Sequence, residues 1–250
     1  MIFDPFGDFE TAGYLQNSLG LKDPNEVKQS EHLVFELGIE DAISFLSSLK
    51  SINYTSLLKV HEILFADFYP WAGRDRSELV PNLAVFKGSS DNPRHTAFEH
   101  PQGIKLAVDY ALRLAADDEQ FKAKPGEVMG LLAFAHPFLD GNGRTILLVF
   151  MELAFRAGFA IDWARTDKDD YLYALSAEIG DPAKGYLNDY LKPFVVEISN
   201  RDQWPELIGG IKGLDGLDKE NMSYGSLDDP EIQKIYATTG YYSSSDPSSD

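Results

Sequence analysis

Cysteine is absent from the 250 residues, and basic residues are few. The lack of cysteine excludes disulfides, thiolate metal ligands and cysteine nucleophiles. Lysine and arginine together number 22 against 40 aspartates and glutamates, which gives a formal net charge of −18. Such a surface repels phosphate backbones and anionic lipid, so we expect neither nucleic acid nor membrane as a main partner. A phosphate-bearing ligand must therefore be held by local groups that work against this field.

Long hydrophobic runs are also lacking. No stretch approaches the roughly 18 apolar residues of a membrane-spanning helix, and residues 1–5 lack a basic segment followed by an apolar one. We therefore expect no ordinary signal peptide and a cytoplasmic location, with which the absence of cysteine is compatible. Apolar residues still make up 44% of the chain, and aromatic residues 12%, which is enough for one sizeable core.

Apolar residues recur at helical spacing through most of the chain up to residue 200, which predicts a mainly helical domain. Asp23 before Pro24, and Asn53 before another periodic segment, are typical N-caps. The segment from Arg144 to Ala157 is apolar on nearly every side, as is typical of a helix in the middle of a bundle. The expected helices begin at residue 24 and span about 54–69, 101–116, 125–135, 144–157, 166–179 (opened by a capping box at Thr166 and Asp169) and 183–198.

Helical spacing fails between residues 76 and 99. Residues 79–80 and 84–86 are short extended candidates, so we expect a small β-hairpin or ordered flap there. Beyond residue 200 the composition changes again, with 10 acidic against 4 basic residues in segment 201–250. We expect residues 1–200 to form one domain, and 201–250 to be an acidic, Gly- and Ser-containing extension that is partly disordered.

The segment His-Pro-Phe-Leu-Asp-Gly-Asn-Gly-Arg-Thr, residues 136–145, joins an amphipathic helix to the apolar central helix. Asp-Gly-Asn-Gly by itself is typical of a plain turn, but the whole segment fits an anion site. Gly141 and Gly143 permit close approach of a ligand to the backbone, and the first N–H groups of the next helix have no partner within it. Arg144 in the first turn opposes the helix dipole unless an anion lies beside it.

Two further side chains of this segment carry chemistry. Asp140 offers the oxygen ligand that Mg²⁺ requires when it bridges a carboxylate to phosphates. His136 titrates near neutrality and can accept a proton from an attacking hydroxyl.

The segment resembles the signature of the Fic family, within the Fic/Doc superfamily: His-x-Phe-x-(Asp/Glu)-Gly-Asn-Gly-Arg-x-x-Arg. The matching positions are His136, Phe138, Asp140, Gly141, Asn142, Gly143 and Arg144. Upstream, residues 61–76 resemble the helix and turn that precede the family's flap. The resemblance covers about residues 10–200. It implies an all-α fold, a Fic-type helical bundle with a small β-hairpin flap at about residues 76–99 and the signature loop at 136–145.

The resemblance implies an adenylyltransferase, which transfers AMP from ATP to a Ser, Thr or Tyr hydroxyl of a target protein. It implies that His136 deprotonates that hydroxyl and that Asp140 binds Mg²⁺ between the α- and β-phosphates. The implied nucleotide-binding residues are Gly141, Asn142, Gly143 and Arg144 in the signature loop and Lys87 and Gly88 in the flap. The target protein would dock on the flap by adding a strand to its edge.

The chain departs from the family pattern at Leu147, where the family has a second arginine that helps orient the γ-phosphate. Leu147 lies one turn beyond Arg144, so it either faces the phosphate site, as we expect, or joins the core. Doc-type sequences, which resemble kinases in their reaction, have Asn-Lys-Arg where this chain has Asn142-Gly143-Arg144. The anion hole is therefore of the AMP-transferring kind.

Regulation and location are the next questions raised by the resemblance. Many members carry an inhibitory motif, (Ser/Thr)-x-x-x-Glu-(Gly/Asn), but no glutamate here has Ser or Thr four residues before it. Inhibition would come from a separate small antitoxin, or the enzyme would be held in check by low intrinsic activity. As a toxin or effector, the protein would act in the cytoplasm or after translocation into a host cell.

Two alternatives stay open for the function. One is a related Fic-type transferase that uses another nucleotide donor or transfers phosphate. The other is a catalytically weak member that binds nucleotide or a partner without turnover. Other catalytic patterns are excluded: His61-Glu62 lacks the second histidine of a zinc protease helix, and no Rossmann or Gly-Lys-Ser/Thr phosphate loop occurs. We expect structural or surface roles for the remaining histidines.

Overall fold

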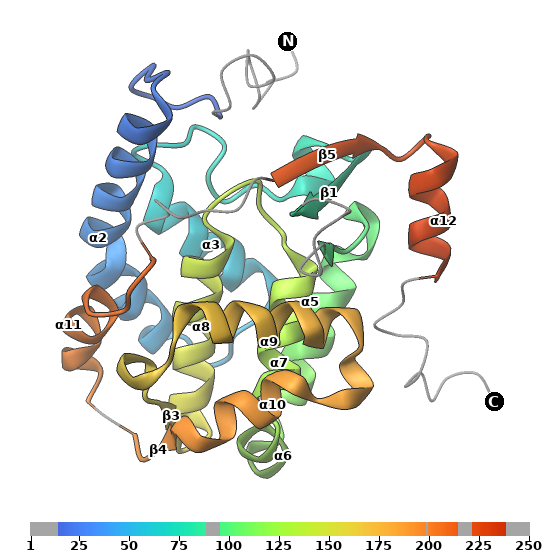
Figure 1. The fold of residues 1–250 in the computed structure, drawn as a ribbon. Helices are drawn as coiled ribbons and strands as arrows, with labels where there is room; N and C mark the ends of the chain where they lie inside the picture. Colours follow the sequence, from blue (N-terminus) through green and yellow to red (C-terminus); the bar gives the residue numbers. More distant parts are fainter. Residues whose placement is uncertain (1–14, 89–95, 199, 215–221, 239–250) are drawn as a thin grey trace.

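The computed structural model describes residues 15–88, 96–198, 200–214 and 222–238, and most of these residues are helical (Figure 1). The helices are α2 (Pro24–Ser48), α3 (Tyr54–Phe65), α4 (Arg76–Leu79), α5 (Ile104–Leu114), α6 (Asp118–Ala123), α7 (Pro125–Ala135), α8 (Asn142–Arg156), α9 (Lys168–Gly180), α10 (Tyr186–Leu191), α11 (Trp204–Gly209) and α12 (Pro230–Thr238). Short 3₁₀ helices lie at Pro101–Gly103, Trp163–Arg165, Pro182–Lys184, Lys192–Phe194 and Arg201–Gln203. The expectation of an all-α fold with a small sheet is confirmed.

The capping residues explain where several helices begin. Asp23 accepts hydrogen bonds from the first N–H groups of α2, and Asn53 forms a capping box with Ser56 at the start of α3. The capping box expected at Thr166 is wrong by one residue. Asp167 is the N-cap of α9 instead, because its carboxylate accepts from Asp169 and Asp170 N–H.

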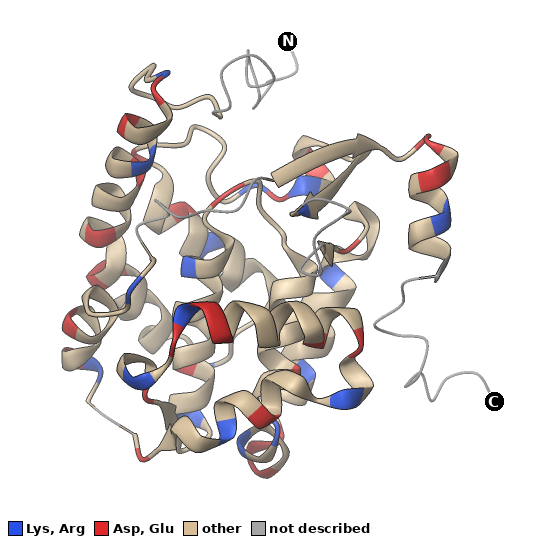
Figure 2. Ribbon diagram, in the orientation of Figure 1, with Lys and Arg blue, Asp and Glu red and all other residues tan. Residues whose placement is uncertain are grey.

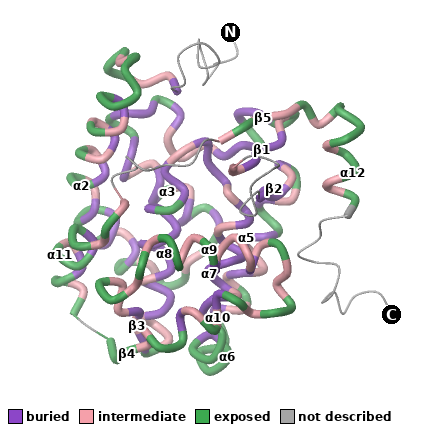
Figure 3. The backbone as a smooth tube through the Cα atoms, in the orientation of Figure 1, coloured by how far each residue is buried: buried purple, intermediate pink, exposed green. Residues whose placement is uncertain are grey.

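The hydrophobic core lies around α8, which packs against α2, α3, α6 and α7. Its apolar side chains are buried on nearly all sides, as the sequence predicts, and Figure 3 shows the central helices mostly buried and the outer helices exposed. Helices α2 and α3 pack on one side of α8, and α7 packs on another. The arrangement fixes both ends of the loop between α7 and α8, which is the signature segment.

A three-stranded sheet lies beside this loop, with the strand order β2-β1-β5. The strands are β1 (Leu83–Lys87), β2 (Thr96–Ala97) and β5 (Met222–Ser226), and both pairings of β1 are antiparallel. A second small sheet pairs β3 (Ala160–Ile161) with β4 (Val195–Val196). The flap hairpin therefore exists, but the extended structure expected at residues 79–80 is wrong in part. Leu79 belongs to α4, whose first turn Asp75 caps.

The segment beyond residue 200 is more ordered than expected over its described parts. Arg201 donates two hydrogen bonds to the buried carboxylate of Glu152 in α8, and Trp204 is 3% exposed. Helix α11 lies beside α2, and β5 completes the flap sheet (Figure 1). The described parts of this segment are ordered because they pack against the helical domain, although their composition is typical of a disordered segment. The expectation of disorder in this extension falls in part on residues 239–250, which lie outside the described residues.

The surface carries the acidic residues that give the chain its negative net charge (Figure 2). Acidic residues recur along α2 and on other outer elements (Figure 2). Among the described helices, none is long and apolar enough to cross a bilayer.

Candidate active site

The signature loop owes its path to two residues in the left-handed region. His136 ends α7 with φ of 40°, and Gly141 precedes α8 with φ of 73°. A side chain on Gly141 would also collide with Phe65, because an added Cβ would lie 2.5 Å from its ring. Glycine is therefore required there twice, by backbone conformation and by packing.

Arg76 holds the start of the loop through backbone contacts. Its Nε donates to the carbonyl of His136 at 2.7 Å, and its Nη2 donates to the carbonyl of Glu99 at 2.8 Å. Its own N–H donates to Pro137 O at 2.7 Å. Arg76 is fully buried, and this burial lowers the pKa of its guanidinium to about 10. The strained backbone of His136 is thus tied to the flap region through one side chain.

His61 supports the other end of the loop. Gly73 N–H donates to its Nδ1 at 2.9 Å, so the proton of the neutral ring is on Nε2, which donates to Asp140 O at 3.1 Å. The ring is fully buried and stacks on Phe138 with centroids 3.7 Å apart. Burial lowers the pKa of His61 to about 3, so the ring stays neutral near pH 7. The structural role expected for this histidine agrees with the geometry.

The His136 ring is half-buried and stacks on Phe98, with centroids 3.8 Å apart and planes 14° from parallel. Phe138 N–H donates to Asn142 Oδ1 at 2.8 Å, so the amide group of Asn142 faces His136. Its Nδ2 lies 3.2 Å from His136 Nε2. This contact requires a lone pair on Nε2, which is the form of the imidazole that can accept a proton.

The Asn142 side chain is thus used within the loop. Its amide also donates to Phe138 O at 2.7 Å, and the residue is 6% exposed. The Asn142 side chain therefore orients the His136 ring by hydrogen bonding within the loop. Only its backbone N–H, in the first turn of α8, is in place for the anion contact that the resemblance implies.

The N-terminus of α8 has the geometry of an anion site. No side chain in the described parts of the chain caps this helix, and its first N–H groups point out of its N-terminus. Gly143 is exposed, and an added Cβ would meet nothing within 4 Å. The Asp140 carboxylate lies beside it, 17% exposed, and its Oδ1 accepts from Gly141 N–H at 2.7 Å.

Arg144 makes the contact that the sequence did not predict. Its Nη2 donates to Glu31 Oε1 at 2.6 Å, and both side chains are buried. Asp140 Oδ1 lies 3.9 Å from the same nitrogen, while Nη1 has no hydrogen-bond partner among the described residues. Burial lowers the pKa of Arg144, but the charges of Glu31 and Asp140 outweigh it and raise the pKa above its ordinary value. The Glu31 carboxylate thus balances the charge of Arg144, for which we expected a ligand anion.

Tyr69 lies close to Glu31, Asp140 and Arg144. It is 1% exposed, and burial followed by the charge of Glu31 raises the pKa of its phenol. The guanidinium of Arg144 lies over the rings of Phe35 and Phe65, at 5.4 and 4.8 Å from their centroids. Leu147 is 6% exposed, so it presents an uncharged, packed side chain one turn beyond Arg144.

Lys87 and Gly88 lie at the end of β1, half-buried, and the next residues of the flap, 89–95, lie outside the described residues. We expected a target strand to add to the edge of the flap, and both sides of β1 are already paired. One neighbour of β1 is β2, and the other is β5 of the same chain. A target could therefore pair with β1 only after β2 or β5 leaves.

The residues present fit a single Mg²⁺ ion better than a protein-bound metal cluster. No group of three or more His, Asp or Glu side chains converges in the described parts of the chain. Mg²⁺ requires few protein ligands, since it is commonly held by one or two carboxylates together with substrate phosphates. Asp140, beside the N-terminus of α8, supplies one such carboxylate.

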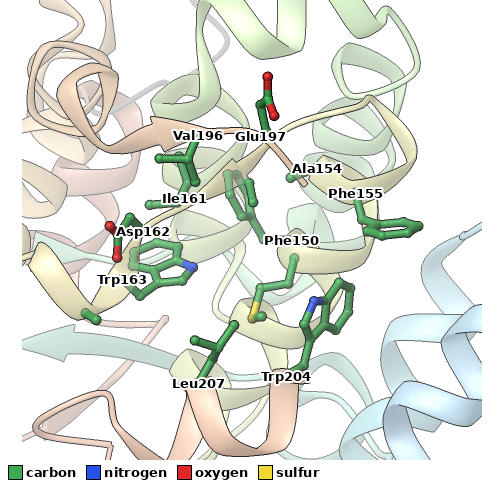
Figure 4. A pocket seen from close by; sticks show the side chains of 13 residues that line it. Phe150, Ala154, Phe155, Ile161, Asp162, Trp163, Val196, Glu197, Trp204 and Leu207 are labelled. Carbon is green, nitrogen blue, oxygen red and sulfur yellow. The ribbon is translucent and has the colours of Figure 1, made fainter. Parts of the chain in front are cut away.

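A cavity of about 200 Å³ lies toward the opposite end of α8 (Figure 4). Its lining is mostly apolar and aromatic, including Phe150, Trp163 and Trp204. The charged residues in this lining are Asp162 and Glu197, which would repel phosphate. The nucleotide is therefore expected at the signature loop and not in this cavity.

Glu31 and the pairing of β5 were missed by the sequence reasoning. Glu31 lies in a helix with acidic residues on its exposed face, and nothing local separates it from them. Arg76 was included in the upstream resemblance, but its contacts with loop carbonyls have no sequence signal.

Comparison with known proteins agrees with this geometry. The family model described as Fic/DOC family matches residues 51–154. The chain is 36% identical over 175 residues to the protein adenylyltransferase VbhT of Bartonella schoenbuchensis, covering 67% of this chain and 34% of VbhT. It is 26% identical over 170 residues to the probable protein adenylyltransferase y4lH of Sinorhizobium fredii, covering 64% and 81%. The chain thus spans about a third of the length of VbhT and most of y4lH.

Solved structures show the same fold. The BepC protein of Bartonella tribocorum with bound AMPPNP superposes with a TM-score of 0.60 at 19% identity, covering 76% of this chain and 96% of that one. The N-terminal Fic domain of a putative cell filamentation protein of Bartonella quintana with bound ADP gives 0.60 at 21% identity, covering 80% and 96%. With the signature residues gathered on one loop, this fold and these relatives, the chain belongs to the Fic/DOC family.

Proposed function

We propose that this protein transfers AMP from ATP to a hydroxyl of a protein, with the signature loop as its active site. The observation that carries the proposal is the juxtaposition of His136 Nε2, held as a proton acceptor by Asn142, with the uncapped N-terminus of α8. A base beside an anion site is what transfer of a phosphate-linked group requires. The relatives named as adenylyltransferases support AMP as the group transferred.

In this proposal His136 takes the proton of the attacking hydroxyl. The first N–H groups of α8 receive the phosphate oxygens, and the open space beside Gly143 admits them. Arg144 adds a positive charge at that end of the helix, and its unpartnered Nη1 is a spare donor. Asp140 would hold Mg²⁺, which neutralises phosphate charge when bound. Lys87 and Gly88, at the end of β1, would clamp the nucleotide from the flap.

The proposal extends to partners and location. The BepC relative is described as a VirB-translocated effector, so a host protein is a candidate target. A separate small antitoxin is a second candidate partner, as the sequence has no inhibitory motif. We further propose that residues 1–200 form the catalytic domain and that residues 201–250 are an acidic extension of it.

A second candidate function is transfer of another group from the same site. Leu147 supports it, because this uncharged side chain lies where the family has a γ-phosphate ligand. Phosphoryl transfer or a different nucleotide donor would then be compatible with the same base and anion site.

Labelling with two forms of ATP tests the proposal. The chain is incubated with Mg²⁺ and cell lysate, in parallel with α- and γ-labelled ATP. We expect the label that depends on the added chain to come from the α-position alone, whereas chain-dependent label from γ alone would show phosphoryl transfer. His136→Ala should reduce the transfer about 10²–10⁴-fold, the usual contribution of a general base. Its melting temperature and its stabilisation by ATP should stay close to those of the unmodified chain.

Asp140→Asn in the same assay tests the metal site, since it keeps the size of the side chain and removes its charge. Transfer should collapse and recover only in part at raised Mg²⁺. Full activity of His136→Ala, or full activity with a chelator present, would contradict the mechanism. Stabilisation by ATP without label from either position would identify a nucleotide-binding member without turnover.

A further inference from the structure

A row of three residues crosses the flap sheet, and one of them contacts His136, the proposed base. The register pairs Phe86 with Ala97, and Phe98 N–H donates to Val85 O, so Phe98 continues the row opposite Val85. On the other side of β1, Val85 is opposite Tyr224 of β5. Residues directly opposite in a sheet share a face, so Phe98, Val85 and Tyr224 all point to one side.

That side is the one that faces the active site. The ring of Phe98 stacks on the ring of His136, 3.8 Å between centroids. Tyr224 lies two strands from Phe98, about 10 Å at the usual strand spacing. It is half-buried and packs against the hydrophobic core. Burial and the negative charge of Asp140 raise the pKa of its phenol, which agrees with a position beside the signature loop.

The opposite face of β5 is covered by α12. An added Cβ on Gly225 would lie 2.2 Å from Ile232, so this helix packs closely on the strand. Tyr236 Oη donates to the carbonyl of Phe98 at 2.9 Å, which ties α12 to the far edge of the sheet. Ser223, one residue before Tyr224, is exposed and points away from the row. Strand β5 is thus held against the flap from both sides, with Tyr224 as the hydroxyl that faces inward.

We propose that β5 occupies the position of a target strand, and that Tyr224 is an AMP acceptor modified by the active site of the same chain. The inference rests on the proposed function and names an acceptor for it. In the step, Tyr224 Oη attacks the α-phosphorus of ATP and forms an Oη–P bond. The bond between the α-phosphorus and the oxygen bridging to the β-phosphate breaks, and pyrophosphate leaves. The phenolic proton passes to His136 Nε2.

The test uses the full 250-residue chain with α-labelled ATP and Mg²⁺, alone and with lysate. Four proteins are compared: the unmodified chain, Tyr224→Phe, Ser223→Ala and His136→Ala. Tyr224→Phe keeps the ring and loses only the hydroxyl, while Ser223→Ala removes the neighbouring hydroxyl of the same strand. We expect self-labelling of the unmodified chain and of Ser223→Ala, and its loss in Tyr224→Phe and His136→Ala. Tandem mass spectrometry of the peptide 220–234 should place AMP on Tyr224.

Mixing experiments show whether the transfer stays within one chain. Active Tyr224→Phe is incubated with His136→Ala, which retains the acceptor but not the base. We expect no label on His136→Ala, and a self-labelling rate per molecule that does not change with protein concentration. Label on His136→Ala, self-label that persists in Tyr224→Phe, or AMP mapped to another residue would overturn the inference.

The lysate arm separates the two proposals. Label on lysate proteins with none on Tyr224 would leave the proposed function standing and refute this inference. Label on neither, in a chain whose melting temperature shows that it is folded, would refute both. Thermal melting of Tyr224→Phe identifies any loss of labelling that comes from a displaced strand, because unpairing β5 would lower the melting temperature.

Discussion

Replacing Glu31 with glutamine should weaken the folded chain and strengthen its response to ATP. The Glu31 carboxylate accepts from Arg144 Nη2 at 2.6 Å and is 3% exposed, so it balances a buried positive charge. Glutamine has nearly the same shape but no charge. The substitution therefore leaves the packing in place and removes one partner of a buried ion pair.

The size of the effect follows from what remains around Arg144. Breaking a buried pair by removing one partner typically costs about 3–5 kcal/mol. Asp140 still lies 3.9 Å from Nη2, and the faces of Phe35 and Phe65 lie under the guanidinium. We therefore expect the lower end, about 3 kcal/mol. At about 2–4 °C per kcal/mol for a chain of this size, the melting temperature should fall by about 6–12 °C.

ATP should reverse part of this loss. In the unmodified chain the Glu31 carboxylate balances the Arg144 charge that would attract a phosphate, whereas in Glu31→Gln only Asp140, 3.9 Å away, still balances it. Because a ligand stabilises the state that binds it, tighter binding raises the melting temperature further at a given concentration. The increase caused by ATP and Mg²⁺ should therefore be larger in Glu31→Gln than in the unmodified chain.

The assay is a thermal melt of each protein with and without ATP and Mg²⁺. Glu36→Gln is the matched control, because it makes the same change on the exposed face of the same helix, where the glutamate is 49% exposed. Its melting temperature should stay close to that of the unmodified chain. The reasoning fails if Glu31→Gln melts like Glu36→Gln. It also fails if the ATP-dependent increase is smaller in Glu31→Gln than in the unmodified chain, since Glu31 would then support binding of the nucleotide.

Two further predictions concern the residues that shape the signature loop. Burial lowers the pKa of His61 to about 3 in the folded state, whereas the ordinary pKa of about 6.5 applies in the unfolded chain. The unfolded chain therefore binds a proton first, and this histidine lowers the stability of the fold progressively as the pH falls from about 6.5. His61→Gln should be less stable at pH 7, but the gap in melting temperature to the unmodified chain should narrow at pH 5; a gap that stays constant would contradict the neutral assignment. Gly141→Ala should lose about 2 kcal/mol or more, because φ of 73° is strained for alanine and its Cβ would meet Phe65. Gly143→Ala, with open space around its Cβ, should melt near the unmodified chain yet transfer less AMP, and equal melting of the two glycine variants would refute the distinction.

The sequence by itself determined the features that depend on neighbouring residues. Asp23 and Asn53 cap the helices they were expected to cap, because an N-cap bonds to N–H groups only two or three residues away. The apolar character of residues 144–157 predicted the buried central helix for the same local reason. The signature segment also forms one loop, since its conformation depends on Gly141 and on contacts such as Asn142 with Phe138, four residues apart.

Predictions from local sequence were wrong where two short patterns predicted different element boundaries with nearly equal strength. Both Thr166 and Asp167 can cap a helix, and the carboxylate of Asp167 is the one that reaches the free N–H groups. Residues 79–80 looked extended beside a proline, but the Asp75 cap made a turn of helix there. Boundaries of this kind depend on a difference of a few tenths of a kcal/mol, which composition does not resolve.

Only the tertiary structure decided which distant groups meet at the site. Glu31 reaches Arg144 across 113 positions of the chain, and β5 pairs with β1 across more than 130. Neither contact has a local signal, because an exposed and a buried glutamate look alike in a helix, and a short strand rich in serine and glycine looks like a linker. Packing of α2 and of the C-terminal segment around the central helix makes these pairs. The core therefore determines both the charge that balances Arg144 and the strand that pairs with the flap.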